Sequence, residues 1–79
     1  MTEYKEDVLL DCSGMQCPLP IVKTKKMIDS MEVDQILKMI STDPGSINDM
    51  AAWSRQTGHE LLESITAEKD FIFYVRKAA

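Results

Sequence analysis

A cysteine followed by two alternating prolines is the part of this 79-residue sequence whose residue types suggest chemistry. The stretch DCSGMQCPLP, residues 11–20, holds both cysteines of the chain, Cys12 and Cys17, and places Pro18 and Pro20 after the second one. A cysteine thiolate is a strong nucleophile, and its reactivity depends on an exposed, electropositive setting. Because two cysteines are too few for the disulfide framework of a small secreted domain, we expect thiol chemistry rather than a structural role.

The two prolines fit the first turn of a helix. If Cys17 is the N-cap, Pro18 and Pro20 occupy the first and third helical positions, where backbone N–H groups have no intrahelical acceptor. The N–H groups of Leu19 and Ile21 are then free to point toward the cysteine sulfur. Together with the positive end of the helix dipole, they would favour the thiolate over the thiol.

A second assignment of the helix start is open, because Leu19 precedes Pro20 and a residue before proline avoids helical angles. In that assignment Leu19 is the N-cap and Pro20 the first helical residue, with Cys17 in the loop but still near the dipole. Both assignments place the sulfur at a rigid, partly exposed corner. Gly14 is expected to supply positive φ in the preceding turn, and Asp11 to cap that loop or to orient a partner.

The elements that must position this loop follow from hydrophobic periodicity and turn residues. We predict strands at 8–12, 35–41, 59–66 and 71–77, helices at 18–31 and 46–58, and an Asp-Pro-Gly turn near 43–45 in which the glycine is free to take positive φ. The order is therefore βαβαββ, with a parallel crossover first and an antiparallel hairpin last. Two helices are too few to cover both faces of a four-stranded sheet, so both should pack on one face.

The same periodicity predicts which side chains are buried. The first helix should bury Ile21, Thr24, Ile28 and Met31, with Val22 at the edge of the stripe. Ser46 is expected to cap the second helix in an acidic capping box with Asp49. The second helix should then turn Ile47, Met50, Ala51 and Ser54 inward. In the last strand, the side chains that point inward should be Phe71, Phe73 and Val75. Ile72 and Tyr74 are then left beside Arg76 on the opposite sheet face, together with Ile36 or Leu37 according to the register.

Length and charge limit the function further. Residues 1–79 should form one domain with a frayed segment at 1–6. The net charge of −4 argues against direct nucleic-acid binding, which depends on basic side chains. No segment has the length of a membrane span or the pattern of a secretory signal, so a cytoplasmic protein without membrane attachment is expected.

The motif and its context together are similar to one known family. LDCSGMQCPLP, followed by STDPGSINDMAAWSRQTGHELL and a terminal YVRK, resembles the TusA/SirA-like sulfur carriers, whose signature is Leu-Asp-x-x-Gly-x-x-Cys-Pro-x-Pro. The similarity extends from about residue 8 to 77. It implies an α+β fold, a two-layer α/β sandwich in which both helices cover one face of a mixed four-stranded sheet.

The resemblance also implies a mechanism. Cys17 would accept sulfane sulfur as a persulfide and pass it on, supported by Asp11, Gly14, Pro18, Leu19 and Pro20. Its partners would be a persulfide donor, such as a cysteine desulfurase or a rhodanese-like protein, and a downstream acceptor protein in tRNA thiolation, molybdenum-cofactor assembly or inorganic-sulfur oxidation. The chain would act with partner enzymes, and this chemistry needs no cofactor and no metal.

Several alternatives remain open from the residues. Cys12, where the family usually has a small non-cysteine residue, is either a core residue, a resolving thiol for a Cys12–Cys17 redox switch, or a second sulfur acceptor. A noncatalytic regulatory module is a third class of function. The lysines of the first helix, Lys23, Lys25 and Lys26, are either a solvated face or a docking surface for an acidic partner.

Overall fold

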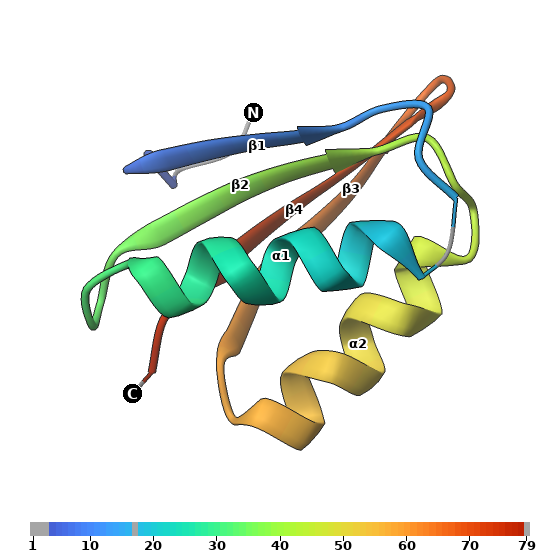
Figure 1. Ribbon diagram of the computed structural model, residues 1–79. Helices are drawn as coiled ribbons and strands as arrows, with labels where there is room; N and C mark the ends of the chain where they lie inside the picture. The colour runs from blue at the N-terminus through green and yellow to red at the C-terminus, as the bar shows by residue number, and fades with distance from the viewer. Residues whose placement is uncertain (1–3, 17, 79) are drawn as a thin grey trace.

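The fold is a four-stranded sheet with two helices on one face (Figure 1). The computed structural model describes residues 4–16 and 18–78 of the chain. The strand order is β1-β2-β4-β3, with β1 and β2 parallel and the other neighbours antiparallel, which confirms the predicted βαβαββ two-layer architecture. The elements are β1 (Val8–Cys12), α1 (Leu19–Ser30), β2 (Ile36–Ser41), α2 (Ser46–Thr57), β3 (Glu60–Ala67) and β4 (Asp70–Arg76).

The core lies between the sheet and the helices. Strands β2 and β4 occupy the centre of the sheet, and side chains at alternate positions point toward the helices, as the pleat requires. Leu37 and Met39 from β2 and Phe73 and Val75 from β4 are fully buried there. The register places Leu37 opposite Val75 and Met39 opposite Phe73, so the two central strands form one continuous apolar surface.

The start of α2 differs from the prediction. The N-cap is Gly45, in right-handed helical geometry rather than at positive φ, and no side chain caps the helix. The Ser46 hydroxyl is buried and forms a hydrogen bond of 2.6 Å with the Ser41 hydroxyl at the end of β2. The predicted Ser46–Asp49 capping box is therefore wrong, because the serine hydroxyl turns inward to satisfy a buried partner.

The buried face of α2 is also rotated from the predicted one. Ser46, Met50 and Trp53 are buried, whereas Ile47 is 38% exposed. The large Trp53 ring joins the core cluster and so sets the orientation of the helix. Gly58 ends the helix with φ of 83°, as its position in the sequence predicts.

The opposite face of the sheet is partly covered by the N-terminal segment. Tyr74 on β4 is only 3% exposed, because the ring of Tyr4 lies 6.1 Å from it and the Lys38 ammonium 5.9 Å from it. The Tyr4 ring therefore contacts Tyr74, and the expected apolar patch loses its largest member. Of the two residues left open by the sequence, Ile36 belongs to this face and Leu37 to the core.

Candidate functional site

The loop between β1 and α1 carries the cysteine-proline motif, and local hydrogen bonds shape it. The backbone N–H of Ser13 donates to the Asp11 carboxylate at 2.9 Å, which is an Asx turn. Gly14 has φ of 81°, the left-handed region that favours glycine. The N–H of Met15 donates to the Cys12 carbonyl at 3.1 Å. These contacts bend the chain sharply between the end of β1 and the residues that lead to the motif.

Hydrogen bonds from Ser13 stabilise the charged form of the Asp11 carboxyl. The hydroxyl of Ser13 and then its backbone N–H lower the pKa of the Asp11 carboxyl below its ordinary value of 3.8. The carboxylate is therefore ionised at neutral pH and holds the loop through Ser13.

The helix begins between the two predicted starts, one residue later than with Cys17 as the N-cap and one residue earlier than with Leu19 as the N-cap. Pro18 is the N-cap, so Leu19 and Pro20 are the first two helical residues. The N–H of Leu19 donates to the Gln16 carbonyl at 2.9 Å, which closes a tight turn just before the helix. The expectation that this N–H group is free for the sulfur is therefore wrong.

Cys17 itself lies outside the described residues, but its surroundings are described. Gln16 and Pro18 on either side of it are exposed, as is Leu19. Pro20 is buried and its carbonyl accepts a hydrogen bond from the Thr24 hydroxyl at 2.7 Å. The motif thus has one proline on the surface and one anchored in the interior of the helix start.

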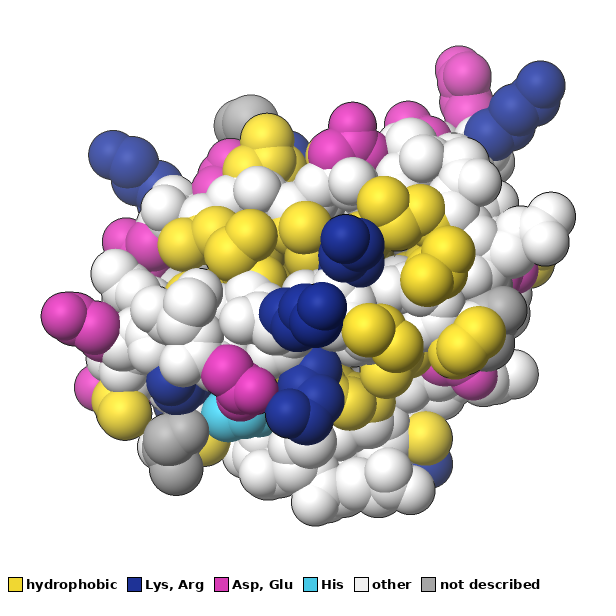
Figure 2. All heavy atoms as spheres, viewed as in Figure 1, with side chains coloured by type: hydrophobic (Ala, Val, Ile, Leu, Met, Phe, Trp, Pro, Cys, Tyr) yellow, Lys and Arg dark blue, Asp and Glu magenta, His cyan; other side chains and the backbone are white. Residues whose placement is uncertain are grey.

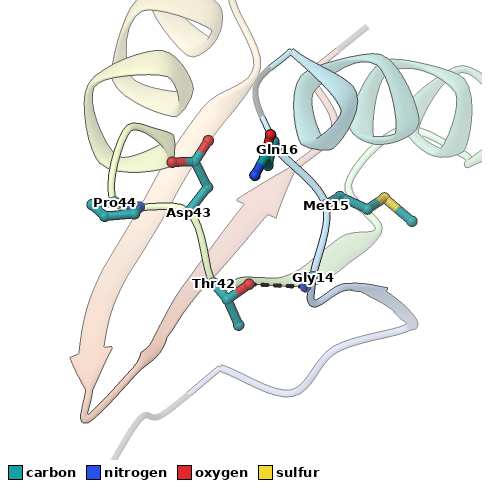
Figure 3. A pocket seen from close by; sticks show the side chains of 6 residues that line it. All are labelled: Gly14, Met15, Gln16, Thr42, Asp43 and Pro44. Carbon is teal, nitrogen blue, oxygen red and sulfur yellow. Dashed lines mark hydrogen bonds between the residues drawn. The ribbon is translucent and has the colours of Figure 1, made fainter.

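A cleft of about 330 Å³ lies between this loop and the loop that joins β2 to α2. Its floor is tied together by a hydrogen bond of 2.8 Å from the Gly14 N–H to the Thr42 hydroxyl, and the side chains of Gln16 and Asp43 stand on facing sides (Figure 3). The Asp43 carboxylate also accepts the N–H of Gly45 at 3.1 Å. The cleft is lined by Gly14, Met15, Gln16, Thr42, Asp43 and Pro44.

Sequence reasoning missed Thr42 and Asp43 as neighbours of the motif loop, because their segment was interpreted only as a turn. A signal was present, since β1 and β2 are parallel and the carboxyl ends of parallel strands meet at one edge of a sheet. Ligand and reaction sites of α/β sheets form at such edges.

Cys12 is a core residue. Its side chain is fully buried at the end of β1 and belongs to the main hydrophobic cluster. Burial raises the pKa of the Cys12 thiol above 9.0, and the neighbouring Asp11 charge raises it further. Both effects hold the sulfur as an unreactive thiol, which favours the core interpretation over a resolving or sulfur-accepting role.

The three lysines of α1 are exposed but not equivalent. Lys25 forms an ion pair of 3.0 Å with Asp29 one turn later. Within the described part of the chain, Lys23 and Lys26 form no such pair. Figure 2 shows basic side chains over the middle of this face, with hydrophobic side chains gathered toward the end at which α1 begins in Figure 1.

Two further observations concern what the chain could bind. The described residues include no group of three or more histidine, cysteine or acidic side chains arranged to hold a metal ion. None of the helices in the described ranges is long and apolar enough to span a bilayer.

Comparison with known proteins places these features in a family. The family model described as sulfurtransferase TusA matches residues 8–77. The chain belongs to the TusA family. The sulfur carrier protein TusA of Allochromatium vinosum is 46% identical over 78 residues, which cover 99% of this chain and all of that protein.

Other relatives agree with the TusA assignment. The Bacillus subtilis protein YrkI is 47% identical over 74 residues, covering 92% of this chain and 97% of its own. The crystal structure of a SirA-like protein from Desulfitobacterium hafniense has the same fold, with a TM-score of 0.77 over 91% of this chain and 99% of that chain at 15% identity. Membership of the TusA family makes this chain a sulfur carrier, which implies exchange of sulfur with donor and acceptor proteins.

Proposed function

We propose that the chain accepts sulfane sulfur as a persulfide on Cys17 and delivers it to an acceptor protein. The observation that carries this proposal is the TusA family match over residues 8–77, which contains the Cys-Pro-Leu-Pro motif. The exposed positions of Gln16 and Pro18 support it, because a carrier sulfur must be reachable by two different proteins. The fully buried Cys12 cannot meet that requirement without unfolding.

The transfer step needs only thiolate chemistry. The Cys17 thiolate attacks the outer sulfur of a protonated donor persulfide, R–S–SH, and the donor S–S bond breaks. The donor leaves as R–S⁻, and Cys17–S–SH forms with the proton still on its outer sulfur. Delivery repeats the same exchange with an acceptor thiolate as the attacking group, so no oxidant, reductant, cofactor or metal is required.

The start of α1 would favour the attacking thiolate. Cys17 directly precedes the N-cap Pro18 of a 12-residue helix, whose dipole favours negative charge at that end. Lys23, within the first two turns, adds positive charge. Pro18, Leu19 and Pro20 fix the direction of the chain, while Gly14 and Asp11 shape the loop that leads to the sulfur.

We place this reaction in a cytoplasmic relay. The donor would be a cysteine desulfurase or a rhodanese-like protein, each of which can present a protein-bound persulfide. The acceptor would belong to tRNA thiolation, molybdenum-cofactor assembly or inorganic-sulfur oxidation, and all three require the same Cys17 step. The chain would bind its protein partners rather than nucleic acid directly, consistent with its net charge of −4.

Intact-mass spectrometry tests the proposal. After incubation with a persulfide donor, the wild-type chain should gain about 32 Da, the mass of one sulfur atom, in a form that dithiothreitol removes. Cys12→Ala should still gain it and Cys17→Ser should not. Retention of the adduct by Cys17→Ser would overturn the assignment, and full biological activity of Cys17→Ala would instead support a noncatalytic regulatory module.

A further inference from the structure

A second cleft lies on the other side of the motif, between α1 and α2. Its volume is about 230 Å³, and Pro18 at its end is the residue that directly follows Cys17. Its walls are mainly apolar, from the side chains of Pro18, Ile21, Ala52 and Trp53, and its polar residues are Asp49 and Gln56. We call this cleft the interhelical groove.

The surface beside the groove is unusually apolar for an exposed helix. Leu19 is 49% exposed and Val22 is 42% exposed, and both lie on the outer side of α1 next to Pro18. Neither side chain is among the buried residues of α1, which are Pro20, Thr24 and Ile28. Exposed apolar side chains that adjoin a cleft are typical of a surface that another molecule covers.

The charge of this surface indicates the kind of partner. Lys26 lies one turn beyond Val22 on the same side of the helix, and Lys23 follows Val22 directly, so the apolar surface has a basic border. Neither lysine has an ion pair within the described residues, whereas Lys25 is neutralised by Asp29. A partner with acidic residues around an apolar side chain would match both features.

We propose that the interhelical groove holds an apolar side chain from the acidic, persulfide-bearing segment of the sulfur donor. This inference rests on the proposed function, since a donor that reaches Cys17 must also cover Pro18 and the groove beside it. The groove side chain would fix the donor segment so that its outer sulfur meets the thiolate. The basic border would draw the acidic segment in from solution.

A matched pair of variants tests the groove. Ala52→Glu places a bulky carboxylate in the groove, and Asn48→Glu adds the same charge at an exposed position of α2 that does not line it. Both residues are in helix α2, where glutamate is well tolerated. Equal thermal unfolding midpoints would show that the two variants are folded alike.

Three donors of defined composition serve as probes. The first is a short persulfidated peptide with a leucine and two glutamates near its cysteine, the second has serine in place of the leucine, and the third is glutathione persulfide. The wild-type chain should react about fivefold faster with the leucine peptide than with the serine peptide, because part of the leucine is buried. Ala52→Glu should lose this preference and Asn48→Glu should keep it. The rate of each variant with glutathione persulfide, which has no leucine, corrects for any change in the reactivity of Cys17 itself.

The border is tested separately with Lys26→Gln and its control Lys69→Gln in the β3–β4 turn. Lys26→Gln should slow sulfur transfer from the acidic leucine peptide about twofold to threefold at low salt, relative to Lys69→Gln. The difference between the two variants should vanish near 0.5 M salt, because the salt screens the charges. Equal rates of the wild type with the leucine and serine peptides would overturn the groove proposal. An equal loss of the leucine preference in Ala52→Glu and Asn48→Glu would also overturn it. Failure of the wild type to load from glutathione persulfide would overturn the carrier function itself.

Discussion

The hydrogen bond from Gly14 to Thr42 should control how firmly the motif loop is held. It joins the β1–α1 loop to the β2–α2 loop across 28 residues of sequence, with a donor–acceptor distance of 2.8 Å. Thr42→Val keeps the shape of the side chain and removes the hydroxyl, while Thr42→Ser keeps the hydroxyl. The comparison of these two variants therefore isolates the hydrogen bond.

The expected size of the effect follows from the exposure of the bond. Because the Gly14 N–H is exposed, water replaces the lost acceptor, and the net cost should be about 1 kcal/mol. This corresponds to about a fivefold increase in the open population of the loop. The free energy of unfolding should fall by about the same amount in Thr42→Val and by less in Thr42→Ser.

Amide hydrogen exchange measured by NMR gives the direct assay. The Gly14 amide should exchange about fivefold faster in Thr42→Val than in Thr42→Ser, with no change at core amides such as that of Phe73. The rate of Cys17 alkylation across pH gives the functional assay, because a loop that opens more often should hold the Cys17 sulfur near the start of α1 for a smaller fraction of the time. Identical Gly14 exchange in the two variants would refute the idea that Thr42 clamps this loop.

Three further predictions follow from the surroundings of the motif. Cys12 should resist alkylation in the folded chain and react after unfolding, and rapid labelling of native Cys12 would contradict its burial. Because burial raises the pKa of this thiol, the unfolded chain should lose the Cys12 proton at a lower pH than the folded chain does. The free energy of unfolding should therefore fall as pH rises above 9.0, relative to that of Cys12→Ala. Ser13→Ala should raise the pKa of Asp11 toward 3.8 in a carboxyl NMR titration, because it removes the hydroxyl that lowers this pKa and leaves the backbone N–H in place. The stabilisation from the lowered pKa is present at neutral pH and is lost as pH falls through it, so Ser13→Ala should be less stable than the wild type at neutral pH. An unchanged titration would show that the Ser13 hydroxyl does not stabilise the carboxylate. Ser46→Ala should lower the free energy of unfolding by about 1–3 kcal/mol, since it removes the buried partner of the Ser41 hydroxyl, and an unaltered melting temperature would show that this pair contributes nothing.

The elements of the fold could be predicted from the sequence because their signals are local. The alternation Phe71, Phe73, Val75 indicated the buried side of the last strand, and Gly58 marked the end of the second helix. The cysteine-proline motif indicated its own position at the start of a helix. Each of these signals acts through sterics and hydrogen bonding within a few residues.

The details that failed depend on neighbours distant in the chain. Ser46 has the sequence of a helix cap, yet its hydroxyl turns to Ser41 because the buried serine needs a partner. Ile47 lies on the predicted inner face of the second helix, yet it is 38% exposed, and Trp53 is buried in the core instead. The local preference of each residue was smaller than the gain from a tertiary contact.

The sequence by itself therefore determined the order of the elements and the family, and it predicts Cys17 as the reactive cysteine. Only the tertiary structure decided that the Thr42 hydroxyl accepts a hydrogen bond from the loop, that Cys12 is buried in the core, and that a groove opens beside Pro18. The physical reason is that periodicity and backbone restrictions act over a few residues. Burial and contacts between loops instead depend on how the sheet and both helices pack together.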